Sequence, residues 1–579
     1  MTVDQAPAEP ATFDPDNAPR PTALEPRQIG FTPRKPVPWL APVLLAGTAV
    51  RVLLAELFGA YLDKRELQNA LPARVYDERP PGDDPDTAEV WFDYIADLGD
   101  GFDPTYSMAW LLAQPELEVD GESTPRGRFV VLGGDQVYPT ASWQQYEDRF
   151  KGPYRAALPH RPEGHRPTLY ALPGNHDWYD GLTAFLRIFA KANHGDIGGW
   201  RTRQSRSYFA IQLPHRWWIF AIDAQFGAYL DDPQMRYFHD AAQQLQPGDR
   251  VILCPPSPGW VEAQHDPHAY DTIDYFVRTV LAPRGVDVKL MISGDLHHYA
   301  RYTGPDRELI TCGGGGAYLY GTHHLPESIP VPPPSTLVRN ATPTKTYTLT
   351  TTYPTKSASR RFAAGVFGRL PWRNPGFVTL LGTLHMLLML ALANATERVA
   401  SGTEQRLVTI PVALMVLILL GGCAYFSMPP TGGRAGTKHW LLGLGHGLVQ
   451  CALGLAGTWV WTRLPLSDLP WPLPLLAAAL LYLPIVGLLS TEVVCGYLLF
   501  ASVFDVNVNE LFAGQSIVDA KGFLRLHIDA DGVLTVYPVA VDRVSRRWTP
   551  KPDAAPDAPW FDPAEPLRYR LAESPIRIR

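Results

Sequence analysis

The stretch Pro173-Gly174-Asn175-His176-Asp177 directly follows the apolar run Thr168–Leu172. Amide, imidazole and carboxylate groups at the end of a strand are typical of a metal site. Three more polar blocks each follow an apolar run: Asp97-Leu98-Gly99-Asp100, Gly134-Asp135-Gln136-Val137-Tyr138 and Gly294-Asp295-Leu296-His297-His298. Four such blocks in succession indicate one site assembled from several strand ends.

Short apolar runs alternate with segments of helical period around these blocks. The clearest strands are expected at 129–132, 168–172, 217–222, 251–254 and 288–292, and helices at 106–114, 181–192 and 269–281. This alternation predicts a layered α/β domain over residues 63–327, flanked by helices and with buried strands. In such domains functional groups collect in the loops at strand ends, where the four blocks lie.

Hydrophobicity is distributed unevenly along the 579 residues. Residues 376–504 contain apolar runs at 376–395, 407–427, 439–461 and 471–504, which predict an α-helical transmembrane region. The last run contains Pro484 and Glu492 and is either one long bent helix or two short ones, so four or five helices are both open. The chain is therefore expected to be a globular domain fused to a membrane bundle.

The remaining segments are distinguished by composition. Residues 1–36 are rich in Pro, Ala and acidic residues, which predicts a disordered tail and no signal peptide. Residues 37–62 predict an amphipathic or membrane-associated helix, with a spanning helix left open. A linker with a basic juxtamembrane cluster is expected over 328–375, and a small C-terminal β-hairpin segment over 505–579, turning at Asp529–Gly532.

The charge pattern bears on location and partners. The cluster formed by Arg360, Arg361, Arg369 and Arg373 before the first apolar run predicts a multi-pass protein of the cell membrane whose globular domain faces the cytoplasm. With four spans the C-terminal hairpin would share that side, and with five it would not. A net charge of −7 gives no basic field for nucleic acid, so membrane lipids are the expected macromolecular surroundings.

The four blocks resemble those of the calcineurin-like metallophosphoesterase superfamily, in a membrane-anchored member of bacterial type. The first two blocks are similar to the purple-acid-phosphatase version, Asp-x-Gly and Gly-Asp-x-x-Tyr. The resemblance covers roughly residues 94–325 and implies a layered β-sandwich with two divalent ions, drawn from Mn, Fe, Zn or Mg. It also implies that metal-activated water attacks phosphorus in line.

The resemblance assigns a role to each matching residue. The first ion would be held by Asp97, Tyr138 and His297, and Asp135 would bridge both ions. Asn175 would bind the second ion. His176 would stabilise the phosphoryl transition state or protonate the leaving oxygen, with Asp177 orienting its ring. The run Gly313–Gly316 is similar to a glycine-rich scaffold that lies beside the active site.

Two positions depart from the family pattern, and both belong to the second ion. Cys254 stands where the family has a lone histidine, and Asp295 replaces the first histidine of Gly-His-x-His. The second site would then use Asn175, Asp135 and Asp295, with Cys254 as a further candidate ligand. A cysteine at a strand end is more often a small buried hydrophobe than a ligand, and that reading is favoured for Cys254. His265 and His268 lie in the following loop and offer replacement imidazoles or solvated side chains.

These observations predict a membrane-anchored, metal-dependent phosphoesterase that hydrolyses a phosphoester or pyrophosphate bond. Its substrate would be a phosphorylated small molecule or a lipid-linked phosphate. The loss of two histidines from the second site favours an alternative: a catalytically degenerate protein of the same fold that acts as a membrane scaffold or sensor. Metal content and hydrolysis distinguish the two.

Overall fold

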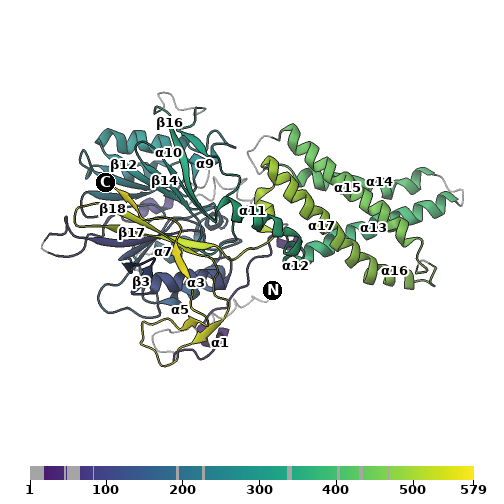
Figure 1. The fold of residues 1–579 in the computed structure, drawn as a ribbon, viewed down its shortest axis with the longest axis horizontal. Helices are drawn as coiled ribbons and strands as arrows, with labels where there is room; N and C mark the ends of the chain where they lie inside the picture. Colours follow the sequence, from purple (N-terminus) through teal and green to yellow (C-terminus); the bar gives the residue numbers. More distant parts are fainter. Residues whose placement is uncertain are drawn as a thin grey trace, which may run out of the picture.

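The computed structural model describes residues 19–44, 47, 66–82, 84–190, 195–224, 229–334, 342–400, 405–429, 435–466 and 468–579. Figure 1 shows a part rich in strands beside a bundle of long helices. The expected mixed α/β class with an apolar helical region is confirmed. Most of the helix expected over 37–62 lies outside the described residues.

The first large sheet has the strand order β1-β9-β10-β11-β12-β14-β13-β16-β15. Strands β10, β11 and β12 run parallel, and β14 continues the parallel set beside β12. The strands span Val75–Asp77 (β1), Phe209–Gln212 (β9), Trp217–Ala221 (β10), Arg250–Cys254 (β11), Asp287–Ser293 (β12), Tyr299–Thr303 (β13), Glu308–Cys312 (β14), Ser328–Val331 (β15) and Lys345–Tyr353 (β16).

The second large sheet has the order β21-β18-β17-β2-β5-β6-β8-β7, with β22 also paired to β18. Its parallel centre is β2, β5 and β6. The strands span Val90–Ile95 (β2), Phe129–Leu132 (β5), Thr168–Ala171 (β6), Asp196–Ile197 (β7), Trp200–Thr202 (β8), Lys521–Ile528 (β17), Leu534–Val541 (β18), Tyr569–Leu571 (β21) and Ile576–Ile578 (β22). Two small hairpins join Glu116–Val119 (β3) to Glu122–Pro125 (β4) and Trp548–Pro550 (β19) to Phe561–Pro563 (β20).

The central strands are buried on both faces, which explains their continuous apolar runs. In β5, Phe129 and Val131 pack in a core cluster that also contains Ile219 and Ile252 of the other sheet. The intervening Val130 belongs to a second cluster, with the helices on the outer face. Because successive side chains point to opposite faces of a strand, one core joins the two sheets and separate cores join each sheet to its helices.

The helices divide between the outer faces of the sheets and the apolar bundle. Residues of α3, α5 and α7 pack against the second sheet, and residues of α8 and α10 against the first. The helices span Pro26–Ile29 (α1), Phe102–Ala113 (α3), Trp143–Tyr146 (α4), Gly152–Ala157 (α5), Asn175–Trp178 (α6), Thr183–Phe189 (α7), Asp232–Ala242 (α8), Gly259–Glu262 (α9), Asp271–Phe276 (α10), Lys356–Ala364 (α11), Leu370–Arg373 (α12), Pro375–Ala400 (α13), Gln405–Phe426 (α14), Thr437–Trp461 (α15), Leu473–Ala477 (α16), Leu483–Ala501 (α17) and Val508–Ala513 (α18).

Two flanking segments differ from the sequence-based expectation. Residues 19–36, expected in a disordered tail, pack on the globular part, with Ile29 and Phe31 buried and the Arg20 guanidinium donating to the carbonyl of Pro559 at 2.6 Å. The expected linker 328–375 contributes β15 and β16 to a sheet edge and contains α11 and α12. Both segments gain order from partners distant in sequence, which local composition does not reveal.

Four helical segments among the described residues are long and apolar enough to cross a membrane: Pro375–Glu397, Thr409–Phe426, Thr437–Trp461 and Leu473–Phe504. The last apolar run, for which one or two helices were open, is a single segment of 32 residues. The expected C-terminal hairpin forms from β17 and β18, and β17 pairs with β2 of the globular part. Both ends of the apolar region are therefore joined to the same globular part.

Candidate metal centre

The four polar blocks meet at the carboxyl ends of β2, β5, β6 and β12. Asp97 N–H donates to the Gly134 carbonyl at 3.0 Å, which ties the first block to the second. Asp97, Asp135 and Asp295 have φ angles of 61°, 50° and 70°, in the left-handed region that non-glycine residues seldom adopt. Such strain collects at functional sites, so its recurrence at the equivalent position of three blocks indicates a shared role.

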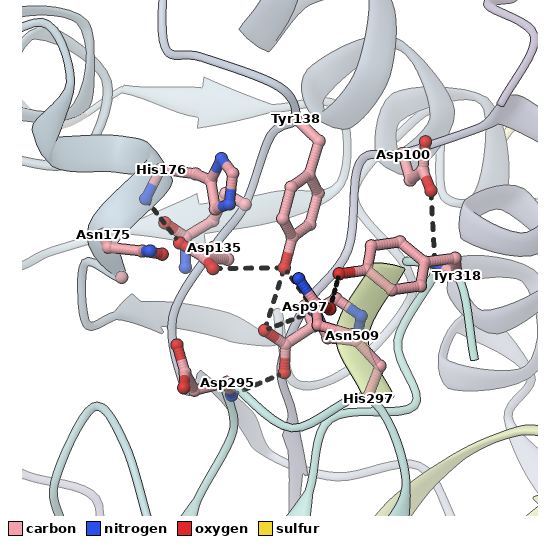
Figure 2. Close-up of polar contacts among 12 residues, drawn as sticks. Asp97, Asp100, Asp135, Tyr138, Asn175, His176, Asp295, His297, Tyr318 and Asn509 are labelled. Atoms are coloured by element: carbon pink, nitrogen blue, oxygen red, sulfur yellow. Dashed lines mark hydrogen bonds and ion pairs between the residues drawn. The ribbon is translucent and has the colours of Figure 1, made fainter. Parts of the chain in front are cut away.

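The hydroxyl of Tyr138 lies at the centre of the site (Figure 2). It is 3.0 Å from Asp97 Oδ1, 3.1 Å from Asp135 Oδ2 and 3.0 Å from His297 Nε2. The expectation that these four residues share one site therefore agrees with their placement. The site therefore offers two carboxylates, an imidazole and a phenol oxygen close together. Divalent transition metals accept such a donor set.

Asn175 and Asp295 lie on the other side of Asp135, as Figure 2 shows. Asn175 opens α6, and its Oδ1 atom is buried without a hydrogen-bond partner. Asp295 N–H donates to Asp97 Oδ2 at 2.9 Å, and the Asp295 carboxyl hydrogen-bonds that of Glu262. An orphaned amide oxygen beside several carboxyl groups fits a cation that accepts oxygen ligands.

The aspartates of the site are buried, and Lys521, a buried amine that interacts electrostatically with Asp97, forms no ion pair with it among the described residues. Burial, together with repulsion from Asp295, raises the pKa of Asp135 to about 8. Burial and the neighbouring carboxylates raise the pKa of Asp97 well above its usual range, and burial raises that of Asp295. In the described part of the chain, no lysine or arginine forms an ion pair with any of the three. Buried carboxylates are costly unless paired or bound to metal, so the site fits a divalent ion.

Tyrosine and asparagine are necessary to this donor set. No three side chains drawn only from His, Cys, Asp and Glu are grouped to hold a metal ion within the ranges that the structure describes. Asp97 Oδ1 and His297 Nε2 are 3.7 Å apart, with the Tyr138 hydroxyl within 3.0 Å of each. The Gly-Asp-x-x-Tyr spacing was therefore the signal in the sequence that pointed to the residue at the centre.

His176 and Asp177 adopt different surroundings from those that the resemblance implies. His176 Nδ1 donates to the Pro139 carbonyl at 2.7 Å, and burial lowers the pKa of its ring to about 4. Asp177 does not orient that ring. Its carboxylate accepts from Tyr146 OH and, at 2.9 Å, from Gly174 N–H. Asp177 thus fixes the turn that carries the block, while the neutral imidazole keeps Nε2 available.

The residues considered for the lost histidine positions separate in space. Cys254 packs in the core between the sheets, and burial raises the pKa of its thiol, so it is protonated there. His268 is exposed and lies 3.1 Å from Asp271 Oδ2. His265 lines a cavity whose wall also includes Glu262, the residue bound to Asp295. Glu262 was not among the expected site residues, because no motif marks its position.

The glycine run Gly313–Gly316 lies directly beneath the first block, as expected of scaffold. A Cβ atom at Gly313 would overlap Asp97 Oδ2, and one at Gly316 would overlap the carbonyl of Leu98. Gly315 N–H donates to the Ala96 carbonyl at 2.9 Å. These contacts require residues without side chains, because the backbone approaches the Asp97 loop too closely for a Cβ.

If this site hydrolyses a phosphoester, we predict that Gly174→Ala lowers that activity by about 10²-fold, because a displacement of about 1 Å at a reacting group has an effect of that size. A Cβ at Gly174 would overlap the Asp135 carboxylate and must displace it. Steady-state kinetics of the purified variant measure the effect. Gly82→Ala is the matched control, since nothing lies within 4 Å of its Cβ position. Equal activity of the two variants would contradict this geometry.

An aromatic wall that no motif predicted covers one side of the site. Trp39 packs edge-on against Tyr138, His176 and Tyr318, with ring centroids 5.8, 5.8 and 5.3 Å away. Asp100 accepts from Val37 N–H at 2.7 Å and from Tyr318 N–H at 3.1 Å. The second aspartate of the first block therefore anchors the N-terminal segment over the site.

Comparisons with known proteins add little to this geometry. No family model and no curated protein matches the sequence. Among solved structures, the chain is similar to one described as GAP50, the anchor in the inner membrane complex of Plasmodium. The TM-score is 0.31 and the identity 16%, over 40% of this chain and 74% of that one. A likeness this weak carries no argument, and what the chain does rests on its own site.

Proposed function

We propose that this chain is a membrane-anchored, metal-dependent phosphoesterase of the calcineurin-like superfamily. The observation that carries the proposal is the convergence of Asp97, Asp135 and His297 on the Tyr138 hydroxyl, at hydrogen-bond distances and from three strand ends. The two sheets that share one core support the sandwich form of that fold. The four apolar helices and the basic segment before them support a multi-pass protein with the site facing the cytoplasm.

Divalent ions, when bound, neutralise the carboxylates, withdraw electron density from a phosphoryl group and activate water for in-line attack. Asp97, Tyr138, His297 and Asp135 would hold one ion, and Asp135, Asn175 and Asp295 the other. Mn, Fe, Zn and Mg all remain candidates, since the donors are mainly oxygen with one imidazole.

The remaining chemistry belongs to side chains of the chain itself. His176 is held by Pro139 through Nδ1–H, so Nε2 can take up a proton and then donate it to a phosphoryl oxygen or to the leaving group. Its low pKa keeps the ring neutral until a phosphate dianion lies beside it. The Trp39 wall and the burial of the aspartates restrict water, which strengthens these electrostatic contacts.

The test is metal analysis and hydrolysis with the full chain purified in detergent. We expect about one or two divalent ions per chain and hydrolysis of p-nitrophenyl phosphate or its diester. A chelator should abolish the activity, and at least one of Mn²⁺, Fe²⁺, Zn²⁺ and Mg²⁺ should restore it. Activity that survives complete metal removal would refute the metal-dependent mechanism.

The degenerate scaffold remains the second candidate. It is favoured by the protonated thiol of Cys254, which offers no thiolate where the second ion would need a ligand. A protein that purifies without metal, binds none on titration and hydrolyses neither substrate would establish it in place of the enzyme.

A further inference from the structure

The candidate metal centre is attached to both ends of the apolar helical region. Leu40 N–H donates to Asn374 Oδ1 at 3.1 Å, and Asn374 immediately precedes α13, the first apolar helix. The neighbouring Trp39 is the aromatic wall that packs on Tyr138 and His176. One wall of the site is therefore tied to the entry of the first helix that could cross a membrane.

A neighbouring residue of this wall, Tyr318, is tied to the exit of the last apolar helix. Tyr318 OH donates to Asn509 Oδ1 at 2.6 Å, a contact drawn in Figure 2, and Asn509 lies in α18, which follows the segment Leu473–Phe504. Tyr318 also packs edge-on against His297, with ring centroids 4.5 Å apart. If the helices cross a bilayer, the site thus lies close to its surface.

A cavity of about 330 Å³ lies beside the Asp295 block and reaches the end of the last apolar segment. Its walls include Leu296, which separates Asp295 from His297, and Glu262, whose carboxyl hydrogen-bonds that of Asp295. Asp505, the first residue after the last apolar segment, forms the far wall. The volume is at the lower end of the range for small-molecule sites and suits a lipid headgroup.

The rim of the cavity carries groups that suit an anionic headgroup. His265 and His324 line the cavity, and Lys356 of α11, which forms an ion pair with Glu327, donates to the carbonyl of Leu325, another lining residue, at 2.7 Å. Figure 1 shows α9 and α11 on the side of the globular part that faces the helical bundle. Basic residues close to a membrane surface attract anionic lipid headgroups. Three acidic residues in the same lining, Glu262, Asp266 and Asp505, oppose that attraction. A phosphate would therefore enter more readily when a cation is bound in the site.

We propose that the substrate is a lipid-linked phosphate presented from the bilayer, whose headgroup enters this cavity while its apolar chain stays among the lipids. This inference rests on the proposed phosphoesterase function. Water would add to phosphorus, the P–O bond to the lipid would break, and the lipid would leave as its alcohol after gaining a proton from water. If the substrate is a pyrophosphate, the lipid leaves as its monophosphate.

The experiment compares two inhibitors that carry the same phosphomonoester, using the full chain in phosphatidylcholine nanodiscs. Hydrolysis of p-nitrophenyl phosphate is the reporter, and either dioleoyl phosphatidic acid in the disc or glycerol 3-phosphate in solution competes. The bilayer holds phosphatidic acid at a high effective concentration beside the site. Phosphatidic acid should therefore inhibit at a total concentration at least about tenfold lower than glycerol 3-phosphate does. Phosphatidylserine, which is anionic without a terminal phosphate, should not inhibit.

Variants of the rim connect this preference to the cavity. The ratio compared is the inhibitory concentration of glycerol 3-phosphate divided by that of phosphatidic acid. Gln264→Trp, in the cavity wall, should lower this ratio at least about fivefold, as expected when a pocket contact is lost. Gln244→Trp, an equally exposed glutamine after α8, should leave the ratio unchanged. His265→Trp narrows the same rim and replaces Gln264→Trp if that variant does not fold.

The outcomes separate this inference from the function on which it rests. Equal inhibition by the two phosphates, or a ratio unaffected by both rim variants, overturns the lipid-linked substrate and leaves the phosphoesterase intact. A wild-type chain that does not hydrolyse the reporter in any metal overturns the function and the inference together.

Discussion

Replacing Asp135 by asparagine is expected to lower phosphoester hydrolysis on the order of 10³-fold, equivalent to about 4 kcal/mol of transition-state stabilisation. The two oxygens of this carboxylate have different partners: Oδ2 lies 3.1 Å from the Tyr138 hydroxyl and Oδ1 accepts from His176 N–H at 2.9 Å. Asparagine keeps the shape of the side chain but removes its charge and one acceptor. Bound metal should therefore fall together with activity.

The Asp135→Asn measurement combines kcat/KM with metal per chain at a fixed concentration of the activating ion. Asp274→Asn is the matched control, because Asp274 is also buried but is paired with Arg278 at 3.1 Å and accepts from Thr342 OH at 2.8 Å. The control should keep its metal and activity. Full activity in Asp135→Asn would remove this site from the chemistry, whereas losing activity in both variants would point to general misfolding.

Much of the strand framework was predictable because its signals are local. The run 129–132 is β5, and the runs at 217–222, 251–254 and 288–292 agree with β10, β11 and β12 to within a residue or two at each end. A strand buried on both faces needs a continuous apolar run, and this signal requires no knowledge of neighbours. The blocks at the strand ends then converge because parallel strands share a carboxyl edge.

The rest of the site depends on contacts between distant parts of the chain. Trp39 lies about 100 residues before Tyr138, and nothing in the surrounding Pro-rich segment indicates that they pack together. Glu262 joins Asp295 from the end of the short helix α9, which carries no motif. The role of Asp177 was also misassigned, because a motif identifies a residue but not which of its neighbours its carboxylate contacts.

The C-terminal hairpin illustrates the same limit at the level of the fold. Its two strands were visible from their alternating pattern and the Asp529–Gly532 turn, but their partner was not. Strand β17 extends the central sheet beside β2, and Gly522 N–H donates to the Gly314 carbonyl at 3.0 Å, beneath the Asp97 loop. A hairpin distant in sequence thus supports the scaffold of the site.

Arg525→Met is expected to lower the free energy of unfolding of the globular part by about 3–5 kcal/mol, the usual effect of leaving a buried charge unpaired. Arg525 and Asp93 are both fully buried, their strands place them directly opposite each other, and Arg525 Nε lies 2.8 Å from Asp93 Oδ1. Burial already raises the pKa of Asp93 despite this partner. Without the guanidinium, the carboxyl must be protonated or the hairpin must separate from β2.

Hydrogen exchange of the β17 amides and denaturant unfolding of the full chain measure this effect. Arg547→Met makes the same substitution in an exposed ion pair with Glu565, where the side chains are 78% and 79% exposed, and should change stability by less than about 1 kcal/mol. Similar effects from the two variants would show that burial does not decide the strength of the Arg525 pair. The double variant Asp93→Leu/Arg525→Met should recover much of the loss, because it removes the unpaired charge as well as its partner. Recovery of stability without recovery of hydrolysis would then mean that the pair positions the Gly314 scaffold in addition to holding the sheet together.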